Sequence, residues 1–176
     1  MTGDAAGGSS LKDLDTLFHD LAAPLREAVT GLDQPVLLIG LETGGVWVRD
    51  RLIEELGVPV ESGSLDISFF RDDYSSRGLP DSPKASQLPI SLDDRHLVLI
   101  DDAIHTGRSI RAAMNAVFER GRPRSVQLAV LVDRGGRDLP IQPDYCGQRI
   151  TLPDHQRVVL SRDGSGTLSI GIEDQS

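Results

Sequence analysis

Two adjacent carboxylates, Asp101 and Asp102, follow a run of four apolar residues and precede the short loop AIHTGRS. Paired carboxylates are suited to binding the hydroxyls of a sugar or a magnesium ion. The loop supplies the hydroxyls of Thr106 and Ser109, and Gly107 permits a tight turn in which successive backbone N–H groups surround an anion. These residue types predict a ligand with a phosphate at one end and hydroxyls or magnesium at the other, as in a phosphorylated sugar.

The same residues also allow a purely structural interpretation. A helix that begins after the loop would be capped by Thr106 or Ser109, and the acidic pair would simply be solvated. The order of strand, acids, glycine turn and helix favours the ligand site. The loop is not a Walker phosphate loop, because the pattern G-x-x-x-x-G-K-[ST] occurs nowhere in the chain.

The elements around this motif alternate between strand and helix patterns. Short apolar runs predict buried strands at residues 35–40, 65–70, 96–100 and 126–132. Apolar residues three or four apart predict helices over residues 11–25, 46–56 and 110–117. Pro24 is expected to bend or end the first helix, and Gly57 and Gly121 are expected to end the other two.

Such strand–helix–strand repeats predict an α/β fold, with a central, mainly parallel sheet that is flanked by helices. Ligands of parallel sheets bind beyond the carboxyl ends of the strands, where Asp101 and Asp102 lie. The segments RVVLS and TLSIGI near the end of the chain are predicted to be short strands at an edge.

Two segments carry no periodic pattern. Residues 1–10 predict a disordered tail, so that residues 11–176 form a single domain. Residues 71–90 combine glycine, serine, prolines and charges, and a loop of this length is typical of a lid or a binding loop.

Composition excludes several classes of protein. The formal net charge of -9 weighs against non-specific binding to nucleic acid or to an anionic membrane. The single cysteine, Cys146, excludes an internal disulfide and a cysteine-based zinc site. No run approaches the ~20 apolar residues of a membrane span, and the N-terminus lacks the pattern of a signal peptide. We therefore expect a cytoplasmic protein without membrane contacts.

The run VLIDDAIHTGRSI resembles the phosphoribosyl-pyrophosphate (PRPP) signature of type I phosphoribosyltransferases. The segments GLETGG, LDISFFRDD and GRPRSVQLAVLVDRGGRDLPIQPDYCG, in this order, are similar to the family of pyrimidine operon attenuation proteins with uracil phosphoribosyltransferase activity. The similarity covers roughly residues 11–172. It implies a type I phosphoribosyltransferase fold with a flexible loop and a small base-binding hood.

The resemblance implies transfer of a phosphoribosyl group from PRPP to uracil, which gives uridine monophosphate and pyrophosphate in pyrimidine salvage. Asp101 and Asp102 would bind the ribose hydroxyls and help to organise Mg²⁺. Two loops would bind substrate: the pyrophosphate loop Thr43, Gly44 and Gly45, and the phosphate loop Ala103, Ile104, His105, Thr106, Gly107, Arg108 and Ser109. An ordinary strand–helix turn is the alternative for residues 43–45.

Three further segments receive roles from the resemblance. Arg71 would close over PRPP as a catalytic residue, whereas Asp72 and Asp73 are better explained as solvated charges. Arg134 would reach the base or the phosphates, with a surface salt bridge as the alternative. Residues 144–147 would form the hood over the pyrimidine, with Tyr145 as a substrate-binding residue or merely a core residue.

The role of His105 stays open. Histidine titrates near neutrality, so general acid–base work on the base is one interpretation. Uracil needs little proton assistance, and a packing or phosphate-side role fits equally well.

The chain departs from the family pattern at several positions. Relatives have arginine in the pyrophosphate loop, where this chain has Gly44. RNA-binding members carry a threonine–arginine pair in the first helix, which here reads LDTLFHDL, and a histidine–arginine pair where this chain has Gly136 and Arg137. Arg122, Arg124 and Arg137 would have to form a local basic patch for mRNA to bind.

Three functions remain in view: a uracil phosphoribosyltransferase, an mRNA-binding attenuator that senses uridine nucleotides in the same pocket, and a phosphoribosyltransferase for another base. Uracil-dependent release of pyrophosphate separates the first from the third, and RNA binding with and without uridine monophosphate tests the second. The resemblance also implies a homo-oligomer, a dimer or larger.

Overall fold

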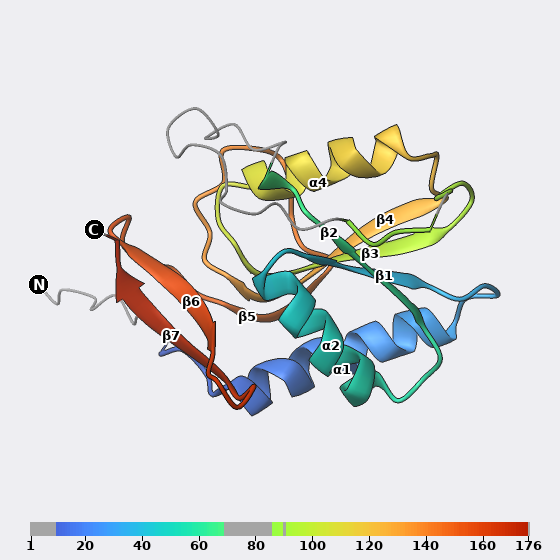
Figure 1. Cartoon of the computed structure of the whole chain (residues 1–176). Helices are drawn as coiled ribbons and strands as arrows, with labels where there is room; N and C mark the ends of the chain where they lie inside the picture. The colour runs from blue at the N-terminus through green and yellow to red at the C-terminus, as the bar shows by residue number, and fades with distance from the viewer. Residues whose placement is uncertain (1–9, 69–85, 90, 176) are drawn as a thin grey trace, which may run out of the picture.

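The computed structural model of the chain describes residues 10–68, 86–89 and 91–175. Figure 1 shows the elements in chain order: α1 (Leu14–Thr30), β1 (Leu37–Leu41), α2 (Gly44–Leu56), β2 (Glu61–Leu65), β3 (His96–Ile104), α4 (Arg108–Glu119), β4 (Ser125–Asp133), β5 (Tyr145–Arg149), β6 (Gln156–Arg162) and β7 (Leu168–Asp174).

Five of the strands form one parallel sheet in the order β2-β1-β3-β4-β5. Every residue of β1 is buried, as the apolar run that predicted it requires of a strand covered on both faces. Because all five strands run the same way, their carboxyl ends meet at one edge of the sheet. The predicted fold class is thereby confirmed.

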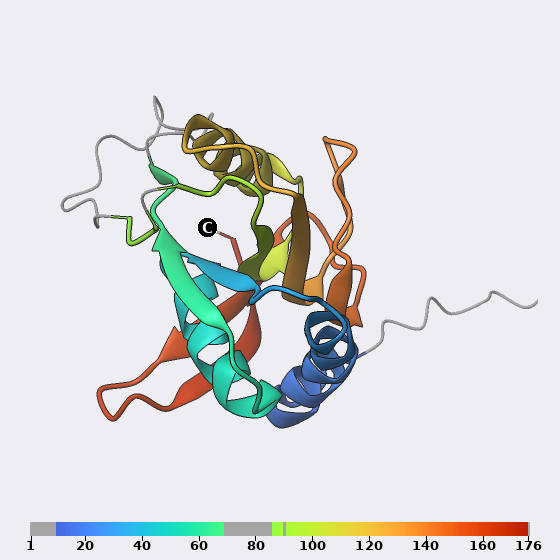
Figure 2. The same ribbon diagram turned by 90° about the vertical axis from the view of Figure 1, so that its right-hand side faces the viewer.

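Helices cover both faces of this sheet, as Figure 2 shows from the side. On one face, α1 and α2 contribute Leu17, Leu21, Val48 and Leu52 to a core that also contains Val98 of β3. On the other face, Ile110, Ala113 and Val117 of α4 pack over the sheet. The amphipathic patterns of the sequence therefore set the three layers of the fold.

Three strand predictions need correction. β2 spans Glu61–Leu65, so the strand predicted at residues 65–70 ends where it was expected to begin. β3 continues past the apolar run to Ile104, which places Asp101 and Asp102 within the strand instead of after it. β6 and β7 form a separate antiparallel hairpin and do not extend the edge of the central sheet.

Pro24 neither ends nor interrupts α1, contrary to the sequence-based expectation. The proline ring is exposed, while Leu21 and Leu25 on either side of it are fully buried. Burial of a leucine contributes about 2 kcal/mol, so the packing of this stripe outweighs the one backbone hydrogen bond that proline removes.

Replacing Pro24 with alanine should therefore stabilise the protein. The new N–H group can donate to the carbonyl one turn earlier, and the gain should be about 1–3 kcal/mol in the free energy of unfolding. Urea denaturation of the two proteins measures it. A lower free energy of unfolding for Pro24→Ala would mean that the proline is accommodated without cost.

The helices within the described ranges include none that is long and apolar enough to cross a membrane.

Candidate active site

The order of the central strands reverses between β1 and β3, and parallel sheets bind ligands at this kind of switch point. Thr43, Gly44 and Gly45 follow the carboxyl end of β1, and Asp101 and Asp102 lie near the end of β3 beside it. Two groups of predicted site residues that are more than fifty positions apart in the chain are thus brought to the same edge of the sheet.

The glycines of the β1–α2 turn lie directly against β3. A Cβ atom on Gly44 would lie 2.8 Å from Cγ of Asp102, and one on Gly45 would lie 2.2 Å from the carbonyl oxygen of Ile100. A side chain at Gly45 would meet the backbone of β3, whereas one at Gly44 would displace the Asp102 carboxylate. The Thr43 side chain makes no capping hydrogen bond to α2, so the N-terminus of this helix, which faces the acidic pair, has no side-chain cap. The free N–H groups at such a helix end favour the binding of anions.

Both carboxylates are half-buried and oriented by the backbone. The amide of Asp102 donates to Oδ1 of Asp101 at 3.0 Å, and the amide of Ala103 donates to Oδ1 of Asp102 at 3.0 Å. These bonds hold each side chain through one oxygen. The arrangement is suited to accepting hydrogen bonds from sugar hydroxyls or to coordinating a hard cation.

The loop after β3 turns at Gly107, whose φ of 89° is a conformation that favours glycine. Helix α4 begins at the next residue without a side-chain cap on Gly107. The amide of Arg108 donates to Oγ1 of Thr106 at 3.3 Å. The alternative interpretation, in which Thr106 caps the helix, therefore holds in part. Ser109 lies in the first turn of α4 and is half-buried. The predicted glycine turn at a helix N-terminus is confirmed.

A second loop, residues 134–142, lies on top of the first. The amide of Arg134 donates to the carbonyl of Ile104 at 3.1 Å, and those of Asp138 and Leu139 donate to the carbonyl of Thr106 at 3.0 and 3.2 Å. A Cβ atom on Gly136 would lie 2.6 Å from Nε2 of His105. Only Arg134, Gly136 and Arg137 of this loop were considered from the sequence.

Arg134 is a buried residue at this junction, with 6% of its surface exposed. Its Nη2 donates to the carbonyl of Pro153 at 3.4 Å, and its Nε has no hydrogen-bond partner among the described residues. The surface salt bridge that was the alternative for Arg134 is therefore wrong. A buried guanidinium N–H without an acceptor costs free energy unless a ligand satisfies it.

The imidazole of His105 is half-buried beside Arg134. Burial is the largest cause that lowers the pKa of His105, and the positive charge of Arg134 acts in the same direction. The ring is therefore neutral at pH 7, and can offer a lone pair more readily than a charged N–H.

We expect the NMR titration of His105 to have its midpoint below the ordinary 6.5. Comparison with a His105→Gln variant assigns the signal. Because folding disfavours the protonated ring, this residue's contribution to stability is present at neutral pH and is lost as the pH falls below the pKa of the unfolded chain. A midpoint above 6.5 would contradict this account of the site.

Tyr145 does not lie where the hood was predicted. It begins β5 and packs against the core on the side of α1, and its hydroxyl donates to Oε1 of Gln127 at 3.2 Å. Residues 145–147 belong to an edge strand of the central sheet, so the prediction of a hood at 144–147 is wrong. Burial raises the pKa of the Cys146 thiol, which agrees with a packing residue instead of a nucleophile.

Two further predictions concern the predicted loop that contains Arg71 and the ligands of Mg²⁺. Arg71, Asp72 and Asp73 lie outside the described residues. Among the residues that the structure does describe, no group of three or more His, Cys, Asp or Glu side chains could hold a metal ion. Asp101 and Asp102 remain the predicted ligands for Mg²⁺, which often takes one or two carboxylates and completes its shell with phosphate oxygens and water.

Known proteins are similar to this chain over most of its length. The family model described as "Phosphoribosyl transferase domain" matches residues 10–161. A protein of Nitrosococcus oceani named "Bifunctional protein PyrR" is 43% identical over 152 residues, which cover 85% of this chain and 86% of the relative. A Pseudomonas fluorescens protein of the same name is 48% identical over 167 residues, covering 94% and 98%.

Solved structures share the fold at low identity. A hypoxanthine phosphoribosyltransferase from Staphylococcus aureus has a TM-score of 0.63 and 18% identity, covering 90% of this chain and 86% of that one. A Trypanosoma cruzi hypoxanthine phosphoribosyl transferase has a TM-score of 0.62 and 20% identity, covering 86% and 83%. At these identities the likeness concerns the fold alone.

Proposed function

Because the chain belongs to the phosphoribosyl transferase family, among relatives named bifunctional protein PyrR, we propose that it transfers the phosphoribosyl group of PRPP to uracil. The products are uridine monophosphate and pyrophosphate. In the reaction a bond forms between C1 of the ribose and N1 of uracil, the bond from C1 to the pyrophosphate oxygen breaks, and the proton of N1 is released.

The single observation that carries the proposal is the contact between Gly44 and Asp102 at the switch point. It brings the turn that would bind pyrophosphate against the carboxylate that would bind the ribose. The phosphate loop follows only a few residues later in the chain. A ligand with pyrophosphate, diol and 5-phosphate in this order would therefore meet a matching group at each point.

Each residue then has a task of binding or charge stabilisation. Asp101 and Asp102 orient the ribose hydroxyls, and their negative charge favours the positive charge that develops at C1. The N–H groups of residues 105–109 hold the 5-phosphate. Arg134 offers its unpaired N–H to the base or to a phosphate oxygen. Arg71 would cover the pyrophosphate and exclude water.

The donor set at the site fits Mg²⁺. Two adjacent carboxylates offer hard oxygen ligands, and the pyrophosphate of the substrate would supply further oxygens. When bound, the ion would neutralise the leaving pyrophosphate. The protein would contribute Asp101 and Asp102 as its own ligands.

A uracil-dependent assay of pyrophosphate release tests the proposal. With PRPP, Mg²⁺ and uracil, the protein should release pyrophosphate, and hypoxanthine, guanine or orotate should give far less. Release with a purine and none with uracil would assign the chain to another base. No release with any base would overturn the enzymatic function.

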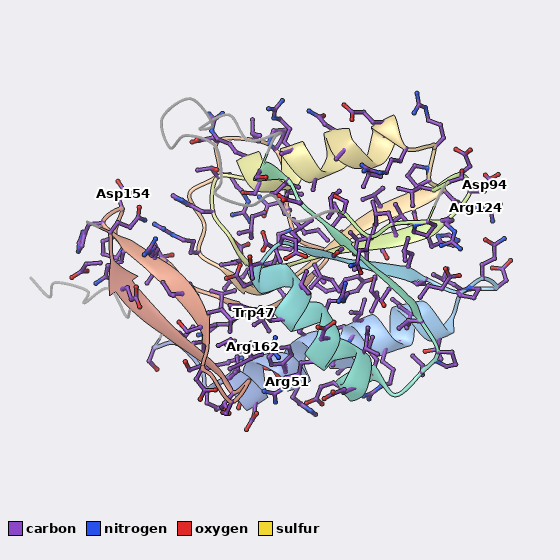
Figure 3. The ribbon with its side chains drawn as sticks, viewed as in Figure 1. Trp47, Arg51, Asp94, Arg124, Asp154 and Arg162 are labelled. Atoms are coloured by element: carbon purple, nitrogen blue, oxygen red, sulfur yellow. The ribbon has the colours of Figure 1, made fainter. Side chains whose placement is uncertain are left out.

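The relatives' name, bifunctional protein PyrR, supports a second candidate function, which is binding of mRNA under control of uridine nucleotides. Arg122, Arg124 and Arg137, the residues of the predicted basic patch, do not lie together on one face. Arg124 precedes β4 at the amino end of the sheet, where Figure 3 places it beside Asp94, and Arg137 follows the carboxyl end of the same strand. The nine residues of β4 separate the two by about 30 Å.

Binding of a pyrimidine-operon leader RNA at two salt concentrations, with and without uridine monophosphate, tests the second function. Tight binding that weakens with salt and strengthens with the nucleotide would support it. We further propose that the protein is a homo-oligomer in the cytoplasm, where its substrates are found.

A further inference from the structure

Arg137 is an arginine of the 134–142 loop whose charged group is turned into the protein. Only 12% of its side chain is exposed. A guanidinium carries five N–H groups, and here it makes four hydrogen bonds and one ion pair. Nε donates to the carbonyl of Ile141 at 2.7 Å, Nη1 to those of His105 and Gly135 at 2.9 and 3.5 Å, and Nη2 contacts Oδ2 of Asp133 at 2.8 Å and Oε1 of Gln142 at 3.3 Å.

These acceptors come from different parts of the site. Asp133 is the last residue of β4 and is 5% exposed, and Ile141 lies at the far end of the second loop. His105 belongs to the phosphate loop, which is joined to β3 and not to β4. The guanidinium therefore ties three segments together, and only its contact with His105 crosses to the phosphate loop.

Another side chain contact joins the same two loops. Nε of Arg108 lies 3.3 Å from Oδ2 of Asp138, and about half of each of these side chains is exposed. An exposed ion pair contributes little, typically below about 1 kcal/mol. The Arg137 side chain is largely covered and is held by four hydrogen bonds and an ion pair. It has far less freedom to move, so it is the more rigid side-chain link between the loops.

We propose that Arg137 is a positioning residue for phosphoribosyl transfer. Through the carbonyl of His105 it fixes the backbone that would bind the 5-phosphate, and it does not itself touch substrate. The proposal rests on the proposed function. It also means that Arg137 has no free N–H for an RNA phosphate, in contrast to the arginine that the family resemblance places in RNA binding.

Steady-state kinetics of an Arg137→Gln variant test the proposal. The KM for PRPP should rise about tenfold or more, because the phosphate loop loses its fixed geometry, while kcat should change much less. The matched control is Arg149→Gln. Arg149 lies 3.7 Å from the same Oδ2 of Asp133, but it is 71% exposed and touches neither loop. Its KM should stay within about twofold of wild type.

A second variant separates positioning from stability. Arg137→Gln removes the nearest positive charge from the buried carboxylate of Asp133, which keeps the amide of Gly135 and, at 3.7 Å, Arg149. The loss of this ion pair should lower the melting temperature. Adding Asp133→Asn removes the charge of that carboxylate and should restore the melting temperature, yet the carbonyl of His105 still lacks its donor. The KM for PRPP should therefore remain high in the double variant.

Three results would overturn the proposal or its premise, and they are distinguishable. A KM that recovers together with the melting temperature would reduce Arg137 to a stabilising residue. A wild-type KM for Arg137→Gln in an active enzyme would remove any role in positioning. A wild-type protein that neither releases pyrophosphate nor binds PRPP in calorimetry would remove the proposed function, and the inference with it.

Discussion

Replacing Asp101 and Asp102 together with asparagine should lower kcat/KM for PRPP by at least about 10³-fold. Asparagine keeps the size of both side chains and can still accept a hydrogen bond from the backbone amides of Asp102 and Ala103. What it removes is the charge that would stabilise the developing positive ribosyl centre and bind Mg²⁺. The assay is uracil-dependent release of pyrophosphate at saturating Mg²⁺.

The matched control is Asp94→Asn. Asp94 has a φ of 56°, which asparagine tolerates as well as aspartate does, and it lies at the amino end of the sheet (Figure 3). The control removes the same kind of charge far from the site and should leave kcat/KM unchanged. Normal turnover by the double variant, with a circular dichroism spectrum like that of wild type, would show that the two carboxylates have been given the wrong role.

The central strands and the turns at Gly57 and Gly107 could be predicted from the sequence, because they depend on local patterns of apolar residues and glycines. Apolar runs gave β1, β3 and β4, since strands covered on both faces need continuous apolar residues. Gly57 marked the end of α2 because its φ of 61° is a conformation that glycine adopts easily. The same reasoning at Gly107 located the phosphate turn.

Features that depend on pairing between distant segments were not predicted. Asp101 and Asp102 break the apolar run, yet β3 continues through them because Asp101 and Ala103 pair with Val130 and Val132 of β4. Tyr145 was assigned to a hood, although it pairs with Ala129 as part of the fifth strand. No local pattern shows which strand a segment will join, because strand pairing depends on residues far away in the chain.

The ion pair between Asp133 and Arg137 was missed for a different reason. In the sequence Asp133 and Arg137 look like ordinary surface residues, and charged side chains are seldom buried unless they are paired. Their spacing of four is a weak signal outside a helix. Only the structure shows that the loop folds back so that Arg137 meets Asp133 and His105 at once.

Replacing Gly44 with alanine should lower kcat/KM for PRPP by about 10²-fold without destabilising the fold. The new Cβ would lie 2.8 Å from Cγ and 2.9 Å from Oδ2 of Asp102. These distances are too short for non-bonded atoms. Because the end of the Asp102 side chain can move, its carboxylate should shift away from the ribose. Alanine at the first residue of α2 favours the helix over glycine, by at most about 1 kcal/mol.

Two further variants make this result decisive, and each has its own signature. Gly45→Ala would place Cβ 2.2 Å from the backbone carbonyl of Ile100, which cannot move alone, so it should lower the melting temperature as well as activity. Gly171→Ala in the hairpin meets nothing within 4 Å and should change neither. If Gly44→Ala kept wild-type kcat/KM, the transfer reaction would not need the Asp102 carboxylate against the β1–α2 turn. The observation on which the proposed function stands would then carry no catalytic meaning.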